Sequence, residues 1–380
     1  MKFFRNVARR VLSHFVVIGL ACVSAEAMAA DSVKIGMIFP VTGSVAYDGQ
    51  AVASGVNAAI SYINQKGGIL GGRKIELELV DSACEPAQSV SAAKRLIAQV
   101  DVKAIIGDFC SNATTALQQV TEEAGVVLIT PVAVSPLLTE RGAKLFFRNN
   151  ATSAMHAKVF SKYVSEVLKL KTIAIIAKND EYGQLDSKIY TQLYQELGNP
   201  KVLYTGFFGA TDEDFSSQIT KAKSMKVDGV YVVAQTEQGA NVLRQMRNLG
   251  MTDVTALGAG ALFNPKVVEL AGKAAEGMYV YTPYDPAATN AGMKLFKEEY
   301  FKRTGKESGL YEAMGWDTLT ILAEAIDRAG TEKDGVKIAA QLHRTDFDGP
   351  RGKITFDEKG QARITTKIVQ VQKGKFVRVH

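Results

Sequence analysis

The sequence of 380 residues is poor in the side chains that most often carry catalysis, with only four histidines and three cysteines. It contains no Gly-x-Ser-x-Gly or His-Glu-x-x-His pattern, so the usual serine-hydrolase and zinc-protease signatures are missing. Basic runs interleaved with aromatic residues are also absent, which argues against a nucleic-acid partner. Beyond the N-terminus, no apolar run approaches the roughly 20 residues of a membrane-spanning helix. We therefore expect neither an enzyme nor a nucleic-acid-binding protein.

The N-terminus has the pattern of a secretory signal peptide. Four basic residues precede an apolar run over residues 11–23, and Ala27-Met-Ala29 supplies the small-x-small pattern of a cleavage site. We expect residues 1–29 to be removed on export, with an uncleaved anchor or lipidation at Cys22 as the alternatives. Removal leaves 41 basic and 38 acidic residues, so the formal net charge falls from +6 to +3. The remaining charge gives little support to an anionic partner.

Two cysteines, Cys84 and Cys110, remain in the predicted mature chain. An even pair in an exported protein favours a disulfide. The bond would close a loop of about 26 residues and stabilise the fold by about 3 kcal/mol in the chain-entropy model. Two reduced, buried thiols are the alternative. Because no histidine-rich cluster accompanies either cysteine in the sequence, we expect no metal site.

From residue 33 onward, short β-branched runs alternate with longer amphipathic stretches. In a first series, strands are expected at residues 33–39, 75–80, 103–106 and 126–130, and helices at 49–65, 87–99 and 112–124. A second series runs from a helix at 153–168 to a strand at 278–282. This alternation is typical of βαβ units with parallel sheets. Two series predict two similar α/β lobes, with a ligand bound beyond the carboxyl ends of the strands.

The C-terminal part departs from this alternation. Helices are expected at residues 291–303, 311–329 and 336–343, followed by an antiparallel meander at 354–357, 364–371 and 376–379. Proline and glycine at 281–286 and 348–350 mark the expected crossings between lobes. We therefore assign residues 30–149 and 283–348 to the first lobe, and residues 150–282 and 349–380 to the second.

Seven segments carry a family resemblance, in the same order along the chain. They lie at residues 35–43, 64–72, 81–86, 106–111, 129–136, 180–183 and 275–283, and include Asp81-Ser-Ala-Cys-Glu-Pro86 and Asp180-Glu-Tyr-Gly183. Together they resemble the periplasmic leucine/isoleucine/valine-binding proteins, the type I solute-binding components of ABC importers. The resemblance covers essentially the whole predicted mature chain.

The resemblance implies two Rossmann-like lobes joined by a three-strand hinge, which close on a ligand between them. It also implies a periplasmic location, an inner-membrane ABC permease as partner, a monomer and no cofactor. The disulfide of the family matches Cys84 and Cys110, which supports the bond between them.

The resemblance also assigns residues to the ligand site. Ser111 matches the serine that holds the ligand carboxylate, and a hydroxyl beside free N–H groups at a helix start suits an anion. Ala133 and Val134 match the loop whose backbone contacts the ligand carboxylate and amine. Tyr182 matches the tyrosine of the second lobe that covers the ligand.

One position departs from the family. Gly260 stands where a carboxylate commonly pairs with the ligand ammonium, and a buried ammonium without a counter-charge is unfavourable. Either the ligand lacks an α-amino group, or another acid replaces the missing one; the candidates are Asp48, Asp108, Glu181 and Glu237.

Four other residues complete the predicted ligand set. Gln235 stands at a position that holds a tyrosine in the second lobe of the family. Tyr47 and Asp48 flank the position where the family contacts the ligand side chain, and Tyr311 lines the apolar end of the ligand site. We predict a solute-binding protein that delivers a small carboxylate, a branched-chain or related amino acid, to an ABC importer. An aromatic or other non-amino carboxylate is the alternative ligand. An exported two-domain enzyme and a ligand-sensing module of a receptor are the alternative functions.

Overall fold

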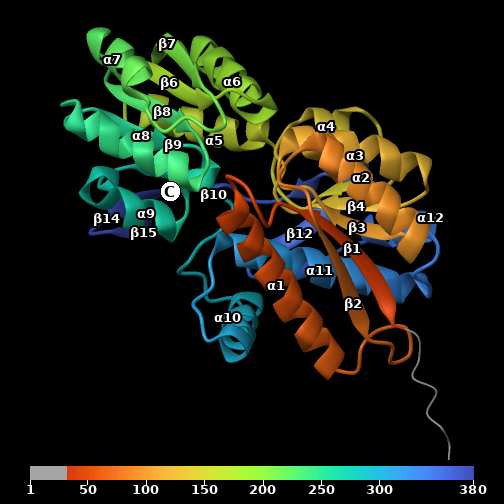
Figure 1. Cartoon of the computed structure of the whole chain (residues 1–380). Coiled ribbons are helices and arrows are strands. Elements are labelled where there is room, and N and C mark those ends of the chain that lie inside the picture. The colour runs from red at the N-terminus through yellow and green to blue at the C-terminus, as the bar shows by residue number, and fades with distance from the viewer. Residues whose placement is uncertain (1–31) are drawn as a thin grey trace, which may run out of the picture. The chain divides into compact units, whose positions relative to one another are not determined.

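The computed structural model describes residues 32–380, and the predicted signal peptide over residues 1–29 lies outside the described residues. Within residues 32–380, helices cover two sheets built mainly of parallel strands (Figure 1). This arrangement confirms the predicted α/β class with two lobes. No helix in this part of the chain is long and apolar enough to cross a membrane.

The first sheet has five parallel strands in the order β2-β1-β3-β4-β5. They are β1 (Val33–Phe39), β2 (Ile75–Asp81), β3 (Ala104–Gly107), β4 (Val127–Thr130) and β5 (Phe146–Arg148). Every residue of β3 and β4 is buried, as expected where helices cover both faces of a parallel sheet. The first four strands confirm the sequence prediction. Strand β5 is not predicted, because three residues are too few to show a periodicity.

The second sheet has seven strands in the order β15-β14-β10-β9-β8-β6-β7. Its parallel strands are β6 (Thr172–Lys178), β7 (Lys201–Phe208), β8 (Gly229–Val233), β9 (Thr255–Gly258) and β10 (Tyr279–Thr282). The antiparallel strands β14 (Lys367–Gln372) and β15 (Lys375–Arg378) complete one edge. The last two strands of the predicted meander therefore join this sheet.

Helices connect the strands of each sheet. Those beside the first sheet are α1 (Ala46–Gln65), α2 (Pro86–Arg95), α3 (Ser111–Glu123) and α4 (Leu137–Glu140), with a π-turn at Leu96–Val100. Those beside the second are α5 (Ser153–Glu166), α6 (Glu181–Leu197), α7 (Ser216–Ser224), α8 (Thr236–Asn248) and α9 (Pro265–Ala271), with 3-10 turns at Gly260–Leu262 and Gly272–Ala275. The late helices α10 (Ala291–Thr304), α11 (Leu310–Ala329) and α12 (Gly335–Leu342) pack on elements of the first lobe.

The local sequence explains several helix starts. The side chains of Thr152, Asp180, Asn264 and Asp334 each accept a hydrogen bond from a backbone N–H in the first turn of the helix that follows. Such caps satisfy N–H groups that lack a partner within the helix. Two of them, at α6 and α9, fix helix starts that bear on the site described below.

The predicted meander is divided between two sheets, because its first part lies in a separate third sheet. It consists of β11 (Phe347–Gly349), β12 (Gly352–Phe356) and β13 (Ala362–Arg363), all antiparallel. This sheet lies against the first lobe: Phe356 packs on Phe147 with ring centroids 5.3 Å apart, and Arg148 N donates to Gly360 O over 2.8 Å. Residues 349–363 thus contact the first lobe, although the sequence analysis assigned 349–380 to the second. The proline and glycine at 348–350 form a hairpin within this sheet.

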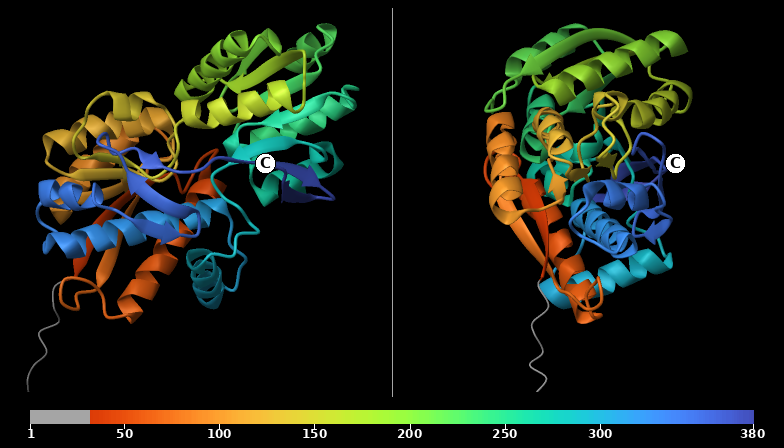
Figure 2. Two further views of the ribbon diagram at one scale, coloured as in Figure 1. Left: turned by 180° about the vertical axis from the view of Figure 1, so that it is seen from behind. Right: turned by 90° about the vertical axis from the view of Figure 1, so that its right-hand side faces the viewer.

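The chain passes between the elements of the two large sheets at residues 149–152, 283–290 and 364–366 (Figure 2). We propose these segments as the three hinge crossings, with the third at 364–366 in place of 348–350. A fully buried ion pair lies beside the first crossing. Arg351 Nε donates to Asp317 Oδ2 over 2.6 Å, and Arg351 Nη1 donates to Asn149 O over 2.9 Å.

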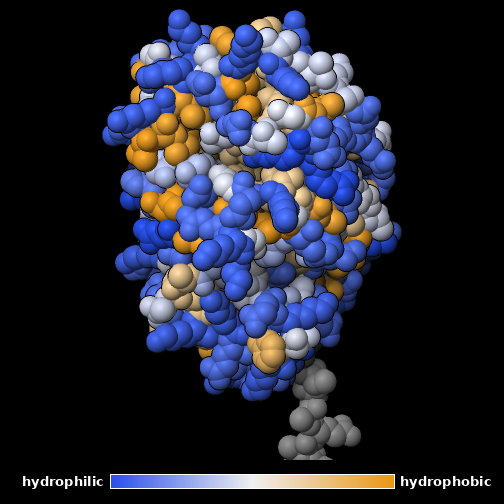
Figure 3. Space-filling view, turned by 90° about the vertical axis from the view of Figure 1, so that its left-hand side faces the viewer, coloured by the Kyte–Doolittle hydropathy of each residue, from blue (hydrophilic) through white to orange (hydrophobic). Residues whose placement is uncertain are grey.

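The face shown in Figure 3 is largely hydrophilic, with apolar residues in small separate groups.

Helices α1 and α11 approach each other closely through two glycines. A Cβ added to Gly55 would lie 2.0 Å from Glu312 O, and one added to Gly315 would lie 2.1 Å from Val52 O. Only glycine fits at these positions, because backbone atoms of the partner helix occupy the space of a side chain. This contact holds the late helix α11, which lines the site, against the first lobe.

We expect G315A to lower the free energy of unfolding by about 1–3 kcal/mol, because the two helices must move apart. The loss should occur although alanine is the better helix former by about 1 kcal/mol. Denaturant unfolding measures the change, with S61A on the exposed face of α1 as the control. An unchanged or higher stability of G315A would contradict the close approach.

Candidate functional site

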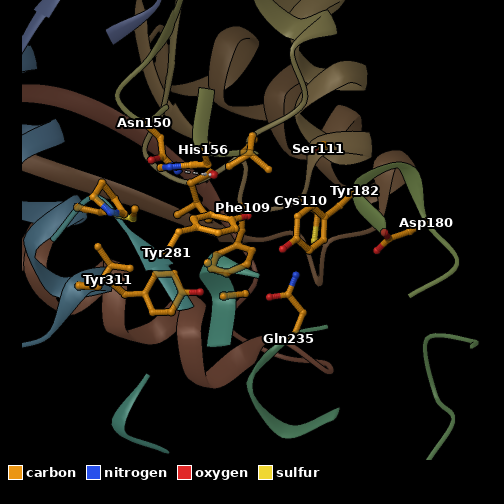
Figure 4. Close-up of a pocket in the computed structure, with 18 of the residues that line it drawn as sticks. Phe109, Cys110, Ser111, Asn150, His156, Asp180, Tyr182, Gln235, Tyr281 and Tyr311 are labelled. Carbon is orange, nitrogen blue, oxygen red and sulfur yellow. Dashed lines mark hydrogen bonds between the residues drawn. The ribbon is translucent and has the colours of Figure 1, made fainter. Parts of the chain in front are cut away.

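A cavity of about 60 Å³ lies between the two lobes, beyond the carboxyl ends of strands from both sheets (Figure 4). This is the position expected for a ligand in such sheets. Seven of the nine predicted ligand residues line it: Ser111, Ala133, Val134, Tyr182, Gln235, Gly260 and Tyr311. Their contacts with a ligand remain a prediction.

The start of α3 forms one wall. Cys110 is the N-cap residue, and Ser111, which opens the helix, is 4% exposed; its Oγ accepts from Ser135 N over 3.3 Å. The first N–H groups of a helix have no partner within it, and the helix dipole makes this end partly positive. The Cys84–Cys110 disulfide, which confirms the prediction, ties this helix start to the loop after β2. The wall can therefore hold an anion without a cationic side chain.

The loop after β4 forms the neighbouring wall, and hydrogen bonds fix its backbone. Ala133 N donates to Thr130 Oγ1 over 3.2 Å, and Ser153 N donates to Val134 O over 2.9 Å. Asn150 Nδ2 donates to Val132 O over 3.0 Å. Within the loop whose backbone is predicted to contact the ligand, the N–H of Ala133 and the carbonyl of Val134 thus already have partners in the protein.

The second lobe contributes polar groups from the starts of α6 and α8. Figure 4 shows the Tyr182 hydroxyl, the Gln235 amide and the Tyr311 hydroxyl pointing toward the same space. Burial raises the pKa of Tyr182 and of Tyr311 well above the usual range, so both phenols stay protonated and can donate. Gln235 Oε1 is buried and has no partner among the described residues. These groups can bond a polar part of a solute.

Gly260 faces an aromatic ring instead of open space. A Cβ at Gly260 would lie 2.8 Å from Tyr281 Cε2, so the Tyr281 ring fills the volume that a larger residue 260 would need. The same ring stacks on His156 with centroids 4.7 Å apart. Burial lowers the pKa of His156 to about 3, so its imidazole is neutral at pH 7. This end of the cavity is therefore aromatic and uncharged.

Another part of the lining is largely apolar apart from the Tyr311 hydroxyl. Tyr311 is 5% exposed and packs on Phe109 with ring centroids 5.6 Å apart. Leu310 and Met314, on the same helix α11, complete this part of the lining. This part of the lining can pack against an apolar or aromatic group of a solute.

None of the four acids considered as replacements for the missing carboxylate lines the cavity. Asp108 bonds to Ser89 within its own lobe, and Glu237 is exposed. Glu181 is half-buried, and its Oε1 has no partner among the described residues. Asp48 contacts the second lobe, as described below.

The one carboxylate in the lining that the structure describes is Asp180. It already accepts from Gly183 N over 2.9 Å and pairs with Lys178 Nζ at 3.2 Å. The lining therefore offers no unpaired carboxylate to a ligand ammonium.

The two other predicted ligand residues lie outside the lining. Tyr47 is 49% exposed, and Asp48 is buried at the contact between the lobes. Conversely, His156 and Tyr281 line the cavity although no sequence motif marked them as ligand residues. Tyr281 lies within the resembling segment 275–283, but nothing in that segment indicates that its ring would face Gly260. For His156, the only feature of the sequence that could have drawn attention to it is that the chain has just four histidines.

Comparison with known proteins agrees with this geometry. A family model described as periplasmic binding protein matches residues 32–375. The chain belongs to this family. It is a family of binding proteins and not of enzymes, as the sequence analysis predicted.

Individual relatives cover nearly the whole chain. The leucine-, isoleucine-, valine-, threonine- and alanine-binding protein of Pseudomonas aeruginosa is 31% identical, over 93% of this chain and 94% of its own length. A leucine-binding protein of Thermotoga maritima has a solved structure with a TM-score of 0.85 and 32% identity, covering 92% of this chain and 98% of that one. A solute-binding protein of Rhodopseudomonas palustris, solved with benzoate, has a TM-score of 0.85 at 20% identity, covering 92% and 96% of the two chains, and shows the shared fold alone.

Removing the disulfide should loosen the start of α3. We expect C84S/C110S to lower the free energy of unfolding by about 3 kcal/mol, because the unfolded chain regains the freedom of the closed loop. Denaturant unfolding of the variant and of the reduced wild-type protein measures the effect, and the two should agree. Equal stability of the variant and the oxidised protein would contradict the prediction.

Proposed function

We propose that the chain captures a small carboxylate between its lobes and delivers it to an ABC importer of the inner membrane. The observation that carries this proposal is the cavity between the lobes, with the start of α3 on one wall and buried aromatic rings on the others. In this proposal the ligand carboxylate bonds to the Ser111 hydroxyl and to the first N–H groups of α3. The apolar body lies toward Tyr311 and Leu310, and Tyr182 and Gln235 bond a polar part of the ligand from the second lobe.

A branched-chain or related amino acid is the proposed ligand, because relatives about 30% identical over nine-tenths of the chain are named for binding leucine and similar amino acids. A small amino acid would leave its ammonium in the cavity. Tyr182, Tyr281 and Gln235 offer it neutral oxygen atoms and no free carboxylate.

One observation favours a second candidate, a carboxylate without an α-amino group. The Tyr281 ring fills the space beside Gly260, and the lining carboxylate Asp180 is already paired with Lys178. Burying an ammonium without a counter-charge is unfavourable by several kcal/mol. An aromatic or branched aliphatic acid avoids this penalty and packs against the same rings.

We also propose that the protein acts in the periplasm and that its partner is the permease of the importer. The signal peptide at residues 1–29 would direct the chain to the periplasm, where it would act as a monomer and meet its permease. Closure of the two lobes on the solute would be the state that the permease recognises.

Ligand binding should raise thermal stability. A carboxylate present at 100 times its Kd stabilises the folded state by about 2.7 kcal/mol. A thermal-shift panel of leucine, isoleucine, valine, alanine, threonine and benzoate should therefore identify at least one ligand. If no carboxylate changes the melting temperature, the proposed function is wrong.

The Ser111 hydroxyl should matter for any ligand found. Losing a hydrogen bond to a charged group removes about 1.5–3 kcal/mol, so S111A should weaken binding about 10- to 100-fold in calorimetry. S91A controls for the loss of a serine hydroxyl away from the cavity, because Ser91 is exposed and its hydroxyl bonds to Ala87 O of its own helix. S111A also removes the acceptor of Ser135 N, so the folded stability of both variants is measured beside the affinity. Equal affinity of S111A and S91A would contradict the carboxylate site.

A matched pair of solutes separates the two ligand candidates. Leucine and 4-methylpentanoate share a carboxylate and a branched body, and only leucine carries an ammonium. If the protein binds amino acids, leucine should bind at least about tenfold more tightly, as expected for a well-bonded charged group. Equal or tighter binding of 4-methylpentanoate would establish the non-amino ligand class.

A further inference from the structure

Asp48 connects the two lobes. It lies in the first turn of α1 and is only 1% exposed. Its carboxylate bonds to the second lobe: Thr236 Oγ1 lies 2.9 Å from both Oδ1 and Oδ2, and Asn264 Nδ2 donates to Oδ1 over 2.8 Å. These bonds join residues 188 and 216 positions apart in the sequence.

The partners on the second lobe are held in place by their own contacts. Asn264 is the N-cap residue of α9, where its Oδ1 accepts from Lys266 N over 2.9 Å, so its amide nitrogen is left for other acceptors. Thr236 is the first residue of α8 and directly follows Gln235, which lines the cavity. Asn264 Nδ2 also lies 3.2 Å from Thr236 Oγ1. A bond from Asp48 to this pair therefore fixes the start of α8 at the cavity.

Among the described residues no cation is paired with Asp48; Lys266 of α9 lies near Tyr47 and Glu237, and its Nζ is paired with Glu269. Burial raises the pKa of Asp48 to about 7, the hydrogen bonds from Thr236 and Asn264 oppose that rise, and the nearby carboxylates of Glu237 and Glu312 add to it. The phenols of Tyr47 and Tyr311 also face Asp48 and, with raised pKa values, stay neutral. A buried carboxyl group in such surroundings is unfavourable when ionised, so it is poorly explained as a simple stabilising bond.

We propose that Asp48, Thr236 and Asn264 form a latch that holds the two lobes together beside the cavity, in the ligand-free as well as the solute-bound protein. That the latch helps to retain a bound solute rests on the proposed function. That it holds the lobes together does not. Opening the lobes would break the bonds of Asp48 to Thr236 and to Asn264 together and return Asp48 to water.

The latch also links closure to pH. In the open form Asp48 is expected near its ordinary pKa of 3.8, and in the closed form it is raised to about 7, so closure takes up a proton between these values. Closure is therefore most favourable below about pH 4 and weakens as the pH rises through about 7. The protonated latch keeps its bonds, because Oδ2–H can donate to Thr236 Oγ1 while Oδ1 still accepts from Asn264.

The test measures the distance between the lobes without any ligand. Spin labels at Q119C on α3 and Q192C on α6, both exposed positions, report the closed and open populations by pulsed electron resonance. The test uses the chain from residue 30 onward, which lacks Cys22; its two native cysteines, Cys84 and Cys110, are bonded to each other, so the labels attach only at the introduced cysteines. In wild type the closed-to-open ratio should rise roughly tenfold for each pH unit as the pH falls from 7 to 5, as uptake of one proton requires.

Two substitutions at Asp48 have opposite expected results. In D48N the amide can donate to Thr236 Oγ1 and accept from Asn264, which mimics the protonated acid. Its closed population should match that of wild type at low pH and lose the part of the pH dependence that Asp48 supplies. D48A and T236V remove latch bonds and should lower the closed-to-open ratio at pH 5 by about tenfold or more.

The matched control is T121V, which removes an equally buried threonine hydroxyl that bonds only within α3, to Leu117 O and Gln118 O. It should leave the distance distribution unchanged. Other titrating groups, such as His156, contribute equally to wild type and D48N, so the difference between these two isolates Asp48.

Wild-type lobes that stay apart at pH 5, or a D48A distribution identical to wild type, would overturn the latch. An unaltered pH dependence in D48N would overturn the role of the Asp48 proton. Because every measurement is made without ligand, a latch that passes these tests while no solute in the thermal-shift panel binds would show that only the proposed function fails.

Discussion

The parallel pairing of the strands within each lobe determines where this molecule can hold a solute. Parallel strands place all their carboxyl ends, and the starts of the helices that follow, at one edge of a sheet. Here two such edges face each other, so the starts of α3, α6 and α8 all reach one cavity. Ser111, Tyr182 and Gln235 lie at those starts, and each depends on the geometry of the strand before it. The late helix α11, held against α1 by Gly55 and Gly315, closes the remaining side.

The lining of the cavity presents the start of helix α3 and aromatic rings in place of unpaired charged side chains. No lysine or arginine is among its lining residues, its histidine is neutral, and its one carboxylate is already paired. A helix start can hold an anion under these conditions, because its N–H groups are fixed in position before the anion arrives. The carboxyl group that the lining does not leave free lies next to the cavity, at Asp48. There it bonds to Thr236 and Asn264 of the second lobe. In the proposed site, recognition of the solute and the contact between the lobes would thus use different groups.

The sequence predicted the class of fold and most strands well, because buried β-branched runs and amphipathic helices leave a local periodicity. Ser111, Tyr182 and Gln235 could be assigned to the site because they follow strands within recognisable segments. Contacts between distant residues could not be predicted in this way. The pairing of Asp48 with Thr236 and Asn264, the filling of the Gly260 position by Tyr281, and the attachment of residues 349–363 to the first lobe depend on tertiary packing. A short strand such as β5, or a hairpin such as β11–β12, carries too few residues for a periodic signal.

The uncharged lining has a consequence for the surroundings in which the protein works. Attraction between exposed charges weakens over about 10 Å in 0.1 M salt, whereas hydrogen bonds inside a buried cavity are screened much less. A site that holds an anion at the start of α3, without lysine or arginine, therefore draws little on long-range attraction. Its equilibrium affinity should be nearly the same in dilute and in saline media. An exported protein, whose surroundings vary in ionic strength more than the cell interior does, would thereby capture its solute equally well across these changes.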